Sequence, residues 1–374
     1  MKNLAFLVLL LVSAVRAGEP PVYVDPEGVI RWRRDDAEVR LFGANYCAFS
    51  GGDYRMAGLV GADRKAMIDE DMAHFARLGF TGLRLCSWGD WENADAQGNL
   101  LLNDHSDLMD YLIAKAAERG ISILLTPIHT YDPRFADKMD QPKESGFSGV
   151  YPRAVLGTDS KAIAAETNYV RQLLDHVNPY RGLALKDDPA ILFVEMINEP
   201  VHHPEDEAGS TAYIDRLVKA VRDSGSRQIT VFNVSQDFRI GKAISASTVD
   251  AVDFGWYPSG LVAGHTQRGN FLPAVESYPP MKAPELARFP RLVYEFDPAD
   301  LDTGYMIPAM ARAFRGVGAQ FAALFAYDML ETAPYNLGWQ THFFNLVHTP
   351  RQAVSAVIAA ELMRRTDAAD FRVS

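Results

Sequence analysis

Two glutamates in this chain each close a run of apolar residues, which is a position where a carboxylate can do chemistry. Residues 191–200 read as a buried strand that gives way to an amide, a carboxylate and a proline, with Glu199 as the carboxylate. Because proline cannot donate to a β-ladder, this strand must end near Asn198. A shorter apolar run delivers Glu295 at its end in the same way. Both carboxylates are therefore predicted at strand ends, where enzymes built on parallel strands hold their active sites.

A pair of strand-end carboxylates suits the cleavage of glycosidic bonds. That reaction needs one carboxylic acid to protonate the leaving oxygen and one carboxylate on the other side of the anomeric carbon. Taken alone, Asn198, Glu199 and Pro200 could be a polar turn that caps a strand. The second run, which ends at Glu295, favours the catalytic interpretation, and we predict Glu199 and Glu295 to be the reacting pair.

The elements that must position these carboxylates alternate along the chain. Strands are predicted at residues 39–45, 81–86, 121–127, 191–198, 229–233, 251–255, 292–295 and 320–327. Helices with an apolar stripe are predicted at residues 64–79, 108–119, 159–177, 209–223, 305–315 and 351–364. Such alternation argues for parallel strands, and closure at eight strands gives a (β/α)8 TIM barrel after an N-terminal β-hairpin. An open doubly wound sheet is the main alternative, but no glycine-rich phosphate loop follows the first strand.

Composition sets further limits on partners and location. The 374 residues carry a net charge of −11, which argues against nucleic acid or an anionic membrane as partner. Residues 1–17 combine a lysine, an uncharged apolar run and a small-residue end, which is the pattern of a secretory signal peptide. We therefore expect residues 18–374 to form one exported domain, periplasmic or extracellular, with no membrane anchor after cleavage.

Cysteines and histidines give little support for other site chemistry. Cys47 and Cys86 are the only cysteines, which excludes a disulfide scaffold. They fall near the ends of the first two predicted strands, so we expect them to lie close together, with or without a bond between them. His129, His202 and His203 lack a further ligand at the spacing of a zinc site, so no metal is expected.

Several segments resemble glycoside hydrolase family 5, the cellulase and mannanase family of retaining β-glycosidases on (β/α)8 barrels. The resemblance lies in residues 39–45, 78–85 and 188–192 and in the two glutamates. It implies that Glu199 is the acid/base and that Glu295 is the nucleophile. The two-carboxylate reaction uses no cofactor, and none is expected here.

The same resemblance assigns roles to residues around the pair. Arg84 and Tyr257 match an arginine and a tyrosine that serve the nucleophile, and a cation and a hydroxyl donor would favour the charged form of a carboxylate. Arg84 could instead pair only with Glu195. Asn198 matches the asparagine that contacts the sugar 2-hydroxyl, and His129 matches a histidine near that subsite.

Two departures from the family pattern concern the strand ends. Where many members have His-x-Tyr after the sixth strand, this chain has Gly255, Trp256 and Tyr257, so the histidine is absent. Where many carry a tryptophan that floors the reacting subsite after the eighth strand, this chain offers Tyr327. Aromatic faces also stack on sugars, and four tryptophans on predicted loops or strand ends are candidates for such subsites: Trp88, Trp91, Trp256 and Trp339.

Together these features predict a secreted retaining β-glycosidase that hydrolyses a β-linked glucan, mannan or related neutral glycan. Its partner is then an oligo- or polysaccharide. A transglycosylase would use the same two glutamates and differ only in the acceptor. A non-catalytic carbohydrate-binding barrel is the other alternative, but binding alone needs neither an acid nor a nucleophile.

Overall fold

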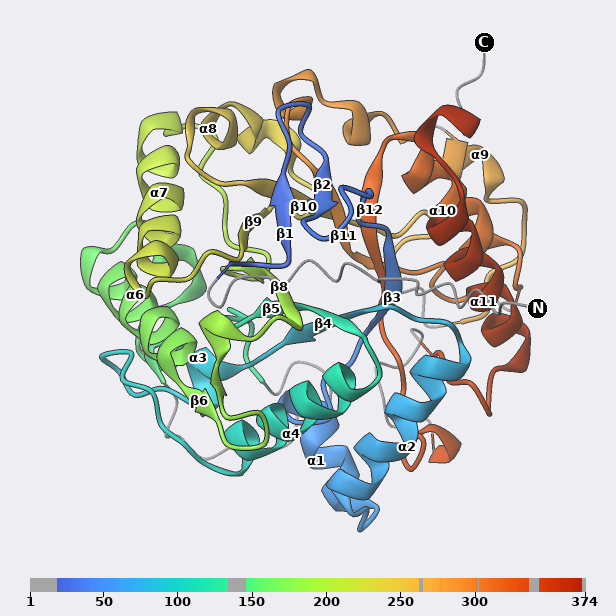
Figure 1. Cartoon of the computed structure of the whole chain (residues 1–374), viewed down its shortest axis with the longest axis horizontal. Coiled ribbons are helices and arrows are strands. Elements are labelled where there is room, and N and C mark those ends of the chain that lie inside the picture. Colours follow the sequence, from blue (N-terminus) through green and yellow to red (C-terminus); the bar gives the residue numbers. More distant parts are fainter. Residues whose placement is uncertain are drawn as a thin grey trace, which may run out of the picture.

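Eight parallel strands close into a barrel at the centre of the protein (Figure 1). This computed structural model describes residues 19–133, 146–261, 265–276, 278–301, 303–335 and 343–371. The barrel strands follow one another in chain order and the last pairs with the first: β3 (Leu41–Asn45), β4 (Gly82–Cys86), β5 (Ser122–Thr126), β8 (Ile191–Glu195), β9 (Ile229–Asn233), β10 (Ala251–Trp256), β11 (Arg291–Phe296) and β12 (Ala319–Leu324). The predicted (β/α)8 fold is confirmed.

Helices return the chain between the strands and cover the outside of the barrel (Figure 1). The longer ones are α2 (Arg64–Arg77), α4 (Asp104–Glu118), α6 (Ser160–Asp175), α7 (Glu207–Asp223), α10 (Met306–Gly316) and α11 (Pro350–Arg365). Polar side chains cap several of them, as Asp63 does by accepting from the N–H groups of Lys65 and Ala66. Asn103 and Ser106 form a capping box at the start of α4. These caps fix where each helix begins and so how long the preceding loop is.

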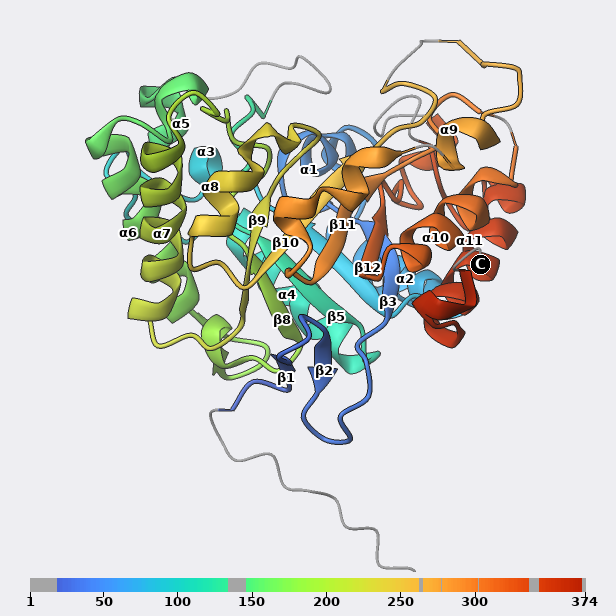
Figure 2. The same ribbon diagram turned by 90° about the horizontal axis from the view of Figure 1, so that it is seen from above.

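The N-terminal hairpin closes the end of the barrel at which the strands begin (Figure 2). Its strands, β1 (Val22–Val24) and β2 (Ile30–Trp32), pair antiparallel, as predicted. Ile30 packs with the apolar side chains that fill this half of the barrel. The side-chain amide of Gln320 bonds to both the N–H and the C=O of Ile30. Because this end is plugged, the functional groups are expected at the opposite end, where the strands finish.

Short helices gather at that opposite end (Figure 2). They are α1 (Gly51–Leu59), α3 (Gly89–Glu92), α5 (Phe147–Val150) and α9 (Leu272–Glu276). They were not predicted from the sequence, because they are too short for a helical stripe and α1 begins with two glycines. The remaining small elements are α8 (Gly241–Ala246), β6 (Val177–Asn178), β7 (Leu183–Ala184) and the 3-10 turns η1 (Arg153–Val155), η2 (Leu185–Asp187), η3 (Phe238–Ile240), η4 (Pro279–Lys282), η5 (Pro284–Leu286), η6 (Ala333–Tyr335) and η7 (Ala368–Phe371).

Two long connections, residues 131–156 and 257–290, contain short helices in their described parts. The described part of residues 131–156 contains α5 and η1, and that of residues 257–290 contains α9, η4 and η5. The signal peptide expected at residues 1–17 lies outside the described residues. Within the ranges that are described, no helix has the length and apolar character to cross a membrane.

Candidate active site

Arg84 is the centre of a polar layer that lies across the barrel interior. It stands on β4 with its side chain fully buried. Its Nε and Nη2 each donate to one carboxylate oxygen of Glu195 at 2.7 Å. Its Nη1 donates to Asn45 Oδ1 at 3.0 Å and to Glu295 Oε1 at 2.8 Å, and Nη2 also reaches Asn198 Oδ1 at 2.7 Å. A guanidinium has five N–H donors, so each donor of Arg84 has an acceptor.

Glu195, on β8, takes part of the charge of Arg84. Besides the guanidinium it accepts from Thr126 Oγ1 at 2.8 Å and from Asn233 Nδ2 at 2.6 Å. Asp253 lies beside it, and burial together with the charge of Glu195 raises the pKa of Asp253 well above its ordinary value. These surroundings favour the protonated form of Asp253. The single positive charge of Arg84 is shared between Glu195 and one further carboxylate.

That further carboxylate is Glu295, which lies near the end of β11 and is 7% exposed. Its Oε1 accepts from Arg84, and its Oε2 accepts from the Tyr257 hydroxyl at 2.7 Å. These are the two donors that the sequence resemblance implied. Burial raises the pKa of Glu295 to about 7, although Arg84 and Tyr257 both favour its charged form. Arg84 compensates only partly because it also serves Glu195.

Glu199 follows β8 and has a backbone φ of 40°, a region that residues other than glycine rarely enter. Its Oε1 accepts from the Tyr294 hydroxyl at 2.5 Å and from Ser235 Oγ at 3.4 Å. Its Oε2 accepts from the Tyr131 hydroxyl at 2.9 Å. The guanidinium of Arg153 donates to its backbone carbonyl oxygen. The carboxylate of Glu199 thus receives hydroxyl donors, and no ion pair reaches it from the described residues.

Three further predicted site residues lie together beside this pair. The ring of Trp88 stacks on that of His129, with centroids 3.6 Å apart. Asn198 donates from Nδ2 to the His129 carbonyl at 3.3 Å while its Oδ1 accepts from Arg84. Burial, with the charges of Arg84 and Arg153, lowers the pKa of His129 well below its ordinary value, so its imidazole is neutral. The hydrogen bonds to Arg84 and to the His129 carbonyl hold the amide of Asn198 on both sides.

Two predicted subsite aromatics, Trp256 and Tyr327, face away from the site, which corrects the expectation. Trp256 stacks on Tyr278 at 4.7 Å and packs against Phe314 of α10. It shares its strand parity with the β10 side chains that pack on the helices, so it points outward. Tyr327 lies beyond β12, which ends earlier than predicted, and its hydroxyl meets Nδ1 of His74 on α2 at 2.8 Å. Both rings belong to the packing between barrel and helices.

Phe325 is an aromatic that the sequence analysis did not single out. It directly follows β12, is half-buried, and packs against a buried cluster of Cys47, Cys86, Trp88 and Ala326. Trp91 packs against the same cluster, and Trp339 lies outside the described residues. A prediction that β12 ends at Leu324 would have singled out Phe325 instead of Tyr327.

The two cysteines lie in that same cluster, so the prediction that they are close is confirmed. Both are free thiols, and the bond that the sequence left open is not formed. Burial raises the pKa of both thiols well above the ordinary value, so neither is a thiolate at neutral pH. They form apolar packing next to Trp88.

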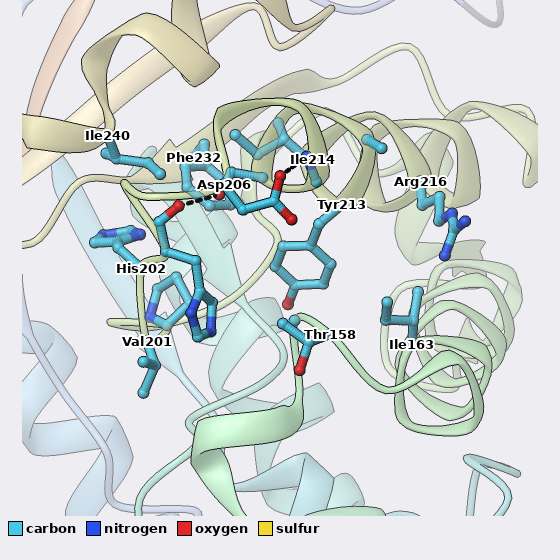
Figure 3. Close-up of a pocket in the computed structure, with 16 residues that line it drawn as sticks. Thr158, Ile163, Val201, His202, Asp206, Tyr213, Ile214, Arg216, Phe232 and Ile240 are labelled. Carbon is cyan, nitrogen blue, oxygen red and sulfur yellow. Dashed lines mark hydrogen bonds between the residues drawn. The ribbon is translucent and has the colours of Figure 1, made fainter.

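A pocket is lined by the loop that follows Glu199 and by residues of α6 and α7 (Figure 3). It has a volume of about 230 Å³, and Tyr213 and His202 are among the side chains that line it. His202 Nε2 contacts the Val234 carbonyl oxygen at 3.1 Å, whereas His203 Nδ1 contacts Glu205 at 3.1 Å. The two histidines therefore have different partners. In the part of the chain that the structure describes, no group of three or more His, Cys, Asp or Glu is placed to hold a metal ion.

The chain is distantly similar in sequence to known proteins. No family model matches the chain. Over 254 residues it is 24% identical to mannan endo-1,4-beta-mannosidase 3 of Oryza sativa subsp. japonica, covering 66% of this chain and 53% of that protein. Over 187 residues it is 21% identical to mannan endo-1,4-beta-mannosidase 3 of Arabidopsis thaliana, covering 49% and 45%. The chain spans about half the length of these curated relatives.

Solved structures share the fold along most of the chain. The endo-1,4-beta-mannanase from Rhizomucor miehei superposes with a TM-score of 0.66 at 16% identity and covers 92% of this chain and 99% of its own. A glycoside hydrolase family 5 mannosidase from the same organism has a TM-score of 0.65 at 13% identity, with 92% and 99% covered. In sequence and in fold, the chain is similar to the mannanase-like proteins of glycoside hydrolase family 5, the family that its strand-end motifs resemble.

Proposed function

We propose that this protein is a retaining β-glycosidase in which Glu295 is the nucleophile and Glu199 is the acid/base. One observation carries the proposal: Glu295 is held by a cation and a hydroxyl, from Arg84 and Tyr257, whereas Glu199 is held by hydroxyl groups. Two carboxyl groups in such different surroundings can take different protonation states, as acid and nucleophile must.

The reaction then runs in two steps. Glu295 attacks the anomeric carbon and forms a glycosyl ester while Glu199 gives its proton to the departing glycosidic oxygen. Glu199, now a carboxylate, takes a proton from water, and that water attacks the same carbon and frees Glu295. We assign the sugar 2-hydroxyl contact to Asn198, as the family resemblance implies, and the hydrogen bonds of its amide to Arg84 and the His129 carbonyl support this role.

The substrate we propose is a β-1,4-linked mannan. Support comes from relatives named as mannan endo-1,4-beta-mannosidases and from solved structures named as mannanase and mannosidase. The net charge of −11 also suits a neutral polymer better than an anionic one, because like charges repel. β-1,4-Glucan is the natural comparison substrate, since the wider sequence resemblance includes cellulases.

Incubation of the purified protein with β-1,4-mannan, β-1,4-glucan, xylan and aryl β-glycosides tests both parts of this proposal. Mannan should be cleaved fastest, and proton NMR should detect the β-anomer of the product first, as retention requires. Product lengths separate exo from endo action, and products longer than the substrate reveal transglycosylation. Cleavage of glucan but not mannan would overturn the substrate and leave the mechanism; no cleavage of any β-glycoside would overturn the mechanism.

We also propose that residues 1–17 direct export and are then removed. The sequence pattern of a charged start, an apolar run and a small-residue end supports this. Expression of the full chain in a bacterium, followed by N-terminal sequencing of the exported protein, should find Gly18 as the first residue. Recovery of uncleaved chain in the cytoplasm alone contradicts it.

A further inference from the structure

A β-bulge in β11 turns two consecutive side chains, Tyr294 and Glu295, toward the barrel interior. Neighbours along a strand normally point to opposite faces of the sheet. Val293 stands opposite Phe254, but the next pair along is Glu295 opposite Gly255, so Tyr294 is the extra residue of a bulge. Tyr294 packs inside the barrel, and Glu295 reaches the polar layer beside it. Bulges of this kind re-aim side chains next to active sites.

The hydroxyl of Tyr294 occupies space that Gly255 leaves open. It donates to Oε1 of Glu199 at 2.5 Å, while its ring lies over the Arg84 guanidinium with the centroid 4.6 Å away. A Cβ atom added to Gly255 would lie 2.7 Å from this hydroxyl oxygen, closer than real Cβ contacts come. A side chain at position 255 and a tyrosine at 294 in this place therefore exclude each other. The glycine that departs from the family pattern is the one that makes room for Tyr294.

We propose that Tyr294 is a positioning residue that fixes Oε1 of Glu199 and leaves Oε2 of Glu199 to carry the transferred proton. The proposal rests on the acid/base role proposed for Glu199. Oε1 is contacted by Tyr294 from β11 and by Ser235 after β9, whereas Oε2 is contacted by Tyr131 in the loop after β5. Tyr294 is fully buried, whereas Tyr131 is half-buried, so we expect a glycosidic oxygen to replace Tyr131 rather than Tyr294 as the partner of Glu199.

The surroundings of Tyr294 keep it a donor. Burial, with the charges of Glu199 and Glu295, raises the pKa of Tyr294 well above its ordinary value, so the phenol stays protonated. Because its hydroxyl contacts only one of the two carboxylates, its loss should harm proton transfer to the leaving group and spare nucleophilic attack. Proton transfer matters most for poor leaving groups, which separates the two roles kinetically.

The test is Tyr294→Phe, assayed as kcat/KM on a series of aryl and alkyl β-glycosides. For poor leaving groups, loss of a hydrogen bond to a charged group predicts a fall of about tenfold to hundredfold. For activated aryl groups the fall should stay within about threefold. Tyr257→Phe is the matched control: it removes a hydroxyl from Glu295 and should slow good and poor substrates alike. A uniform loss in Tyr294→Phe, or no loss, overturns the proposal.

A double-mutant cycle with Gly255→Ala tests the pairing of the two positions. The new methyl should displace the Tyr294 hydroxyl and reproduce the leaving-group dependence of Tyr294→Phe. In the Tyr294→Phe background, the same alanine should add little further leaving-group dependence, because the hydroxyl it displaces is gone. Fully additive losses contradict the pairing, and circular dichroism confirms that each variant folds.

Infrared difference spectra separate failure of this inference from failure of the glycosidase proposal, because they follow the Glu199 carboxyl group in the protein without substrate. Glu199→Gln assigns the bands. In Tyr294→Phe the carboxyl bands of Glu199 should shift in frequency, because Oε1 has lost its 2.5 Å hydrogen bond. Identical bands in both proteins overturn the role of Tyr294, whatever the protein hydrolyses.

Discussion

The two candidate catalytic carboxylates are held in different ways. Glu295 lies within the polar layer of the barrel, where Arg84 on β4 and Tyr257 after β10 bind its two oxygens. Glu199 has a positive φ and takes only hydroxyl donors among its described contacts, one of them from the loop residue Tyr131. The surroundings of Glu295 are therefore set by the barrel, whereas those of Glu199 depend partly on a loop.

Glu295 is therefore held mainly by a charged group, whereas Glu199 is held by neutral hydrogen-bond donors. Each N–H donor of Arg84 is engaged, and removing one partner of a buried ion pair typically costs about 3–5 kcal/mol. Glu295 thus has a permanent cation beside it. Among the described residues the carboxylate of Glu199 accepts hydrogen bonds from hydroxyl groups alone, so it can gain or lose a proton without leaving an ion-pair partner unpaired. The arrangement suits one group that reacts as an anion and one that changes its protonation state.

The largest effect that separates the two sites is expected from Glu295→Ala. Without the nucleophile no glycosyl ester can form, so turnover should vanish on every substrate while the fold survives. Added azide should restore part of the activity and give the inverted product. Near wild-type turnover in this variant would remove Glu295 from the mechanism.

Glu199→Ala is the matched contrast at the other carboxylate. Its loss of kcat/KM should be large for poor leaving groups and small for activated aryl groups, which need little protonation. Equal losses on both kinds of substrate would mean that the two carboxylates do not differ in role.

The sequence predicted the barrel well because the strand signals were strong. Mainly apolar runs such as residues 191–195 and 251–256 are long enough to mark buried parallel strands, and closure follows from their number. The short helices at the active end have no such signal. α1 starts with two glycines and α3 has four residues, so local patterns could not reveal them.

The site was predictable where a residue ends a regular strand. Glu295 was found in this way, whereas Arg84 and Tyr257 came from the family resemblance, and the three side chains do meet. Tyr294 was missed because simple alternation places it on the face opposite Glu295, and only the bulge brings both inward. Tyr327 was misplaced for a related reason, since β12 ends earlier than its apolar run suggests.

Tyr257→Phe sharpens the comparison on the side of Glu295. Losing one hydrogen bond to a charged group costs about 1.5–3 kcal/mol, which predicts a roughly tenfold to hundredfold fall in kcat/KM. The pKa of Glu295 should also rise above about 7, because the charged form loses a donor. The acid limb of the pH–rate profile should therefore move to higher pH. An unchanged rate and profile would mean that Arg84 alone holds the nucleophile.

Glu195→Gln tests whether the shared charge of Arg84 sets the pKa of Glu295. The wild-type kcat/KM should rise with pH through about 7, since Glu295 reacts in its ionised form and burial raises its pKa to that value. The variant removes a competing anion, so the pKa of Glu295 should fall, and the acid limb should move down by about one pH unit. Stability should also fall, so rates are compared where both proteins are folded. An acid limb that stays at the same pH or moves to higher pH would contradict the idea that Glu195 and Glu295 share the charge of Arg84.

The smallest effect is expected where the contact with Glu199 is longest. Ser235 Oγ lies 3.4 Å from Oε1, beyond the usual range for O–H···O hydrogen bonds, whereas the Tyr294 hydroxyl lies at 2.5 Å. Ser235→Ala should therefore lower kcat/KM for poor leaving groups by less than about threefold. Ser235 has a φ of 55°, so Ser235→Gly is the control that removes the hydroxyl without keeping a side chain in this strained region. A loss in both variants as large as that of Tyr294→Phe would mean that Oε1 is held by the pair of hydroxyls, and Tyr294 would lose its separate role.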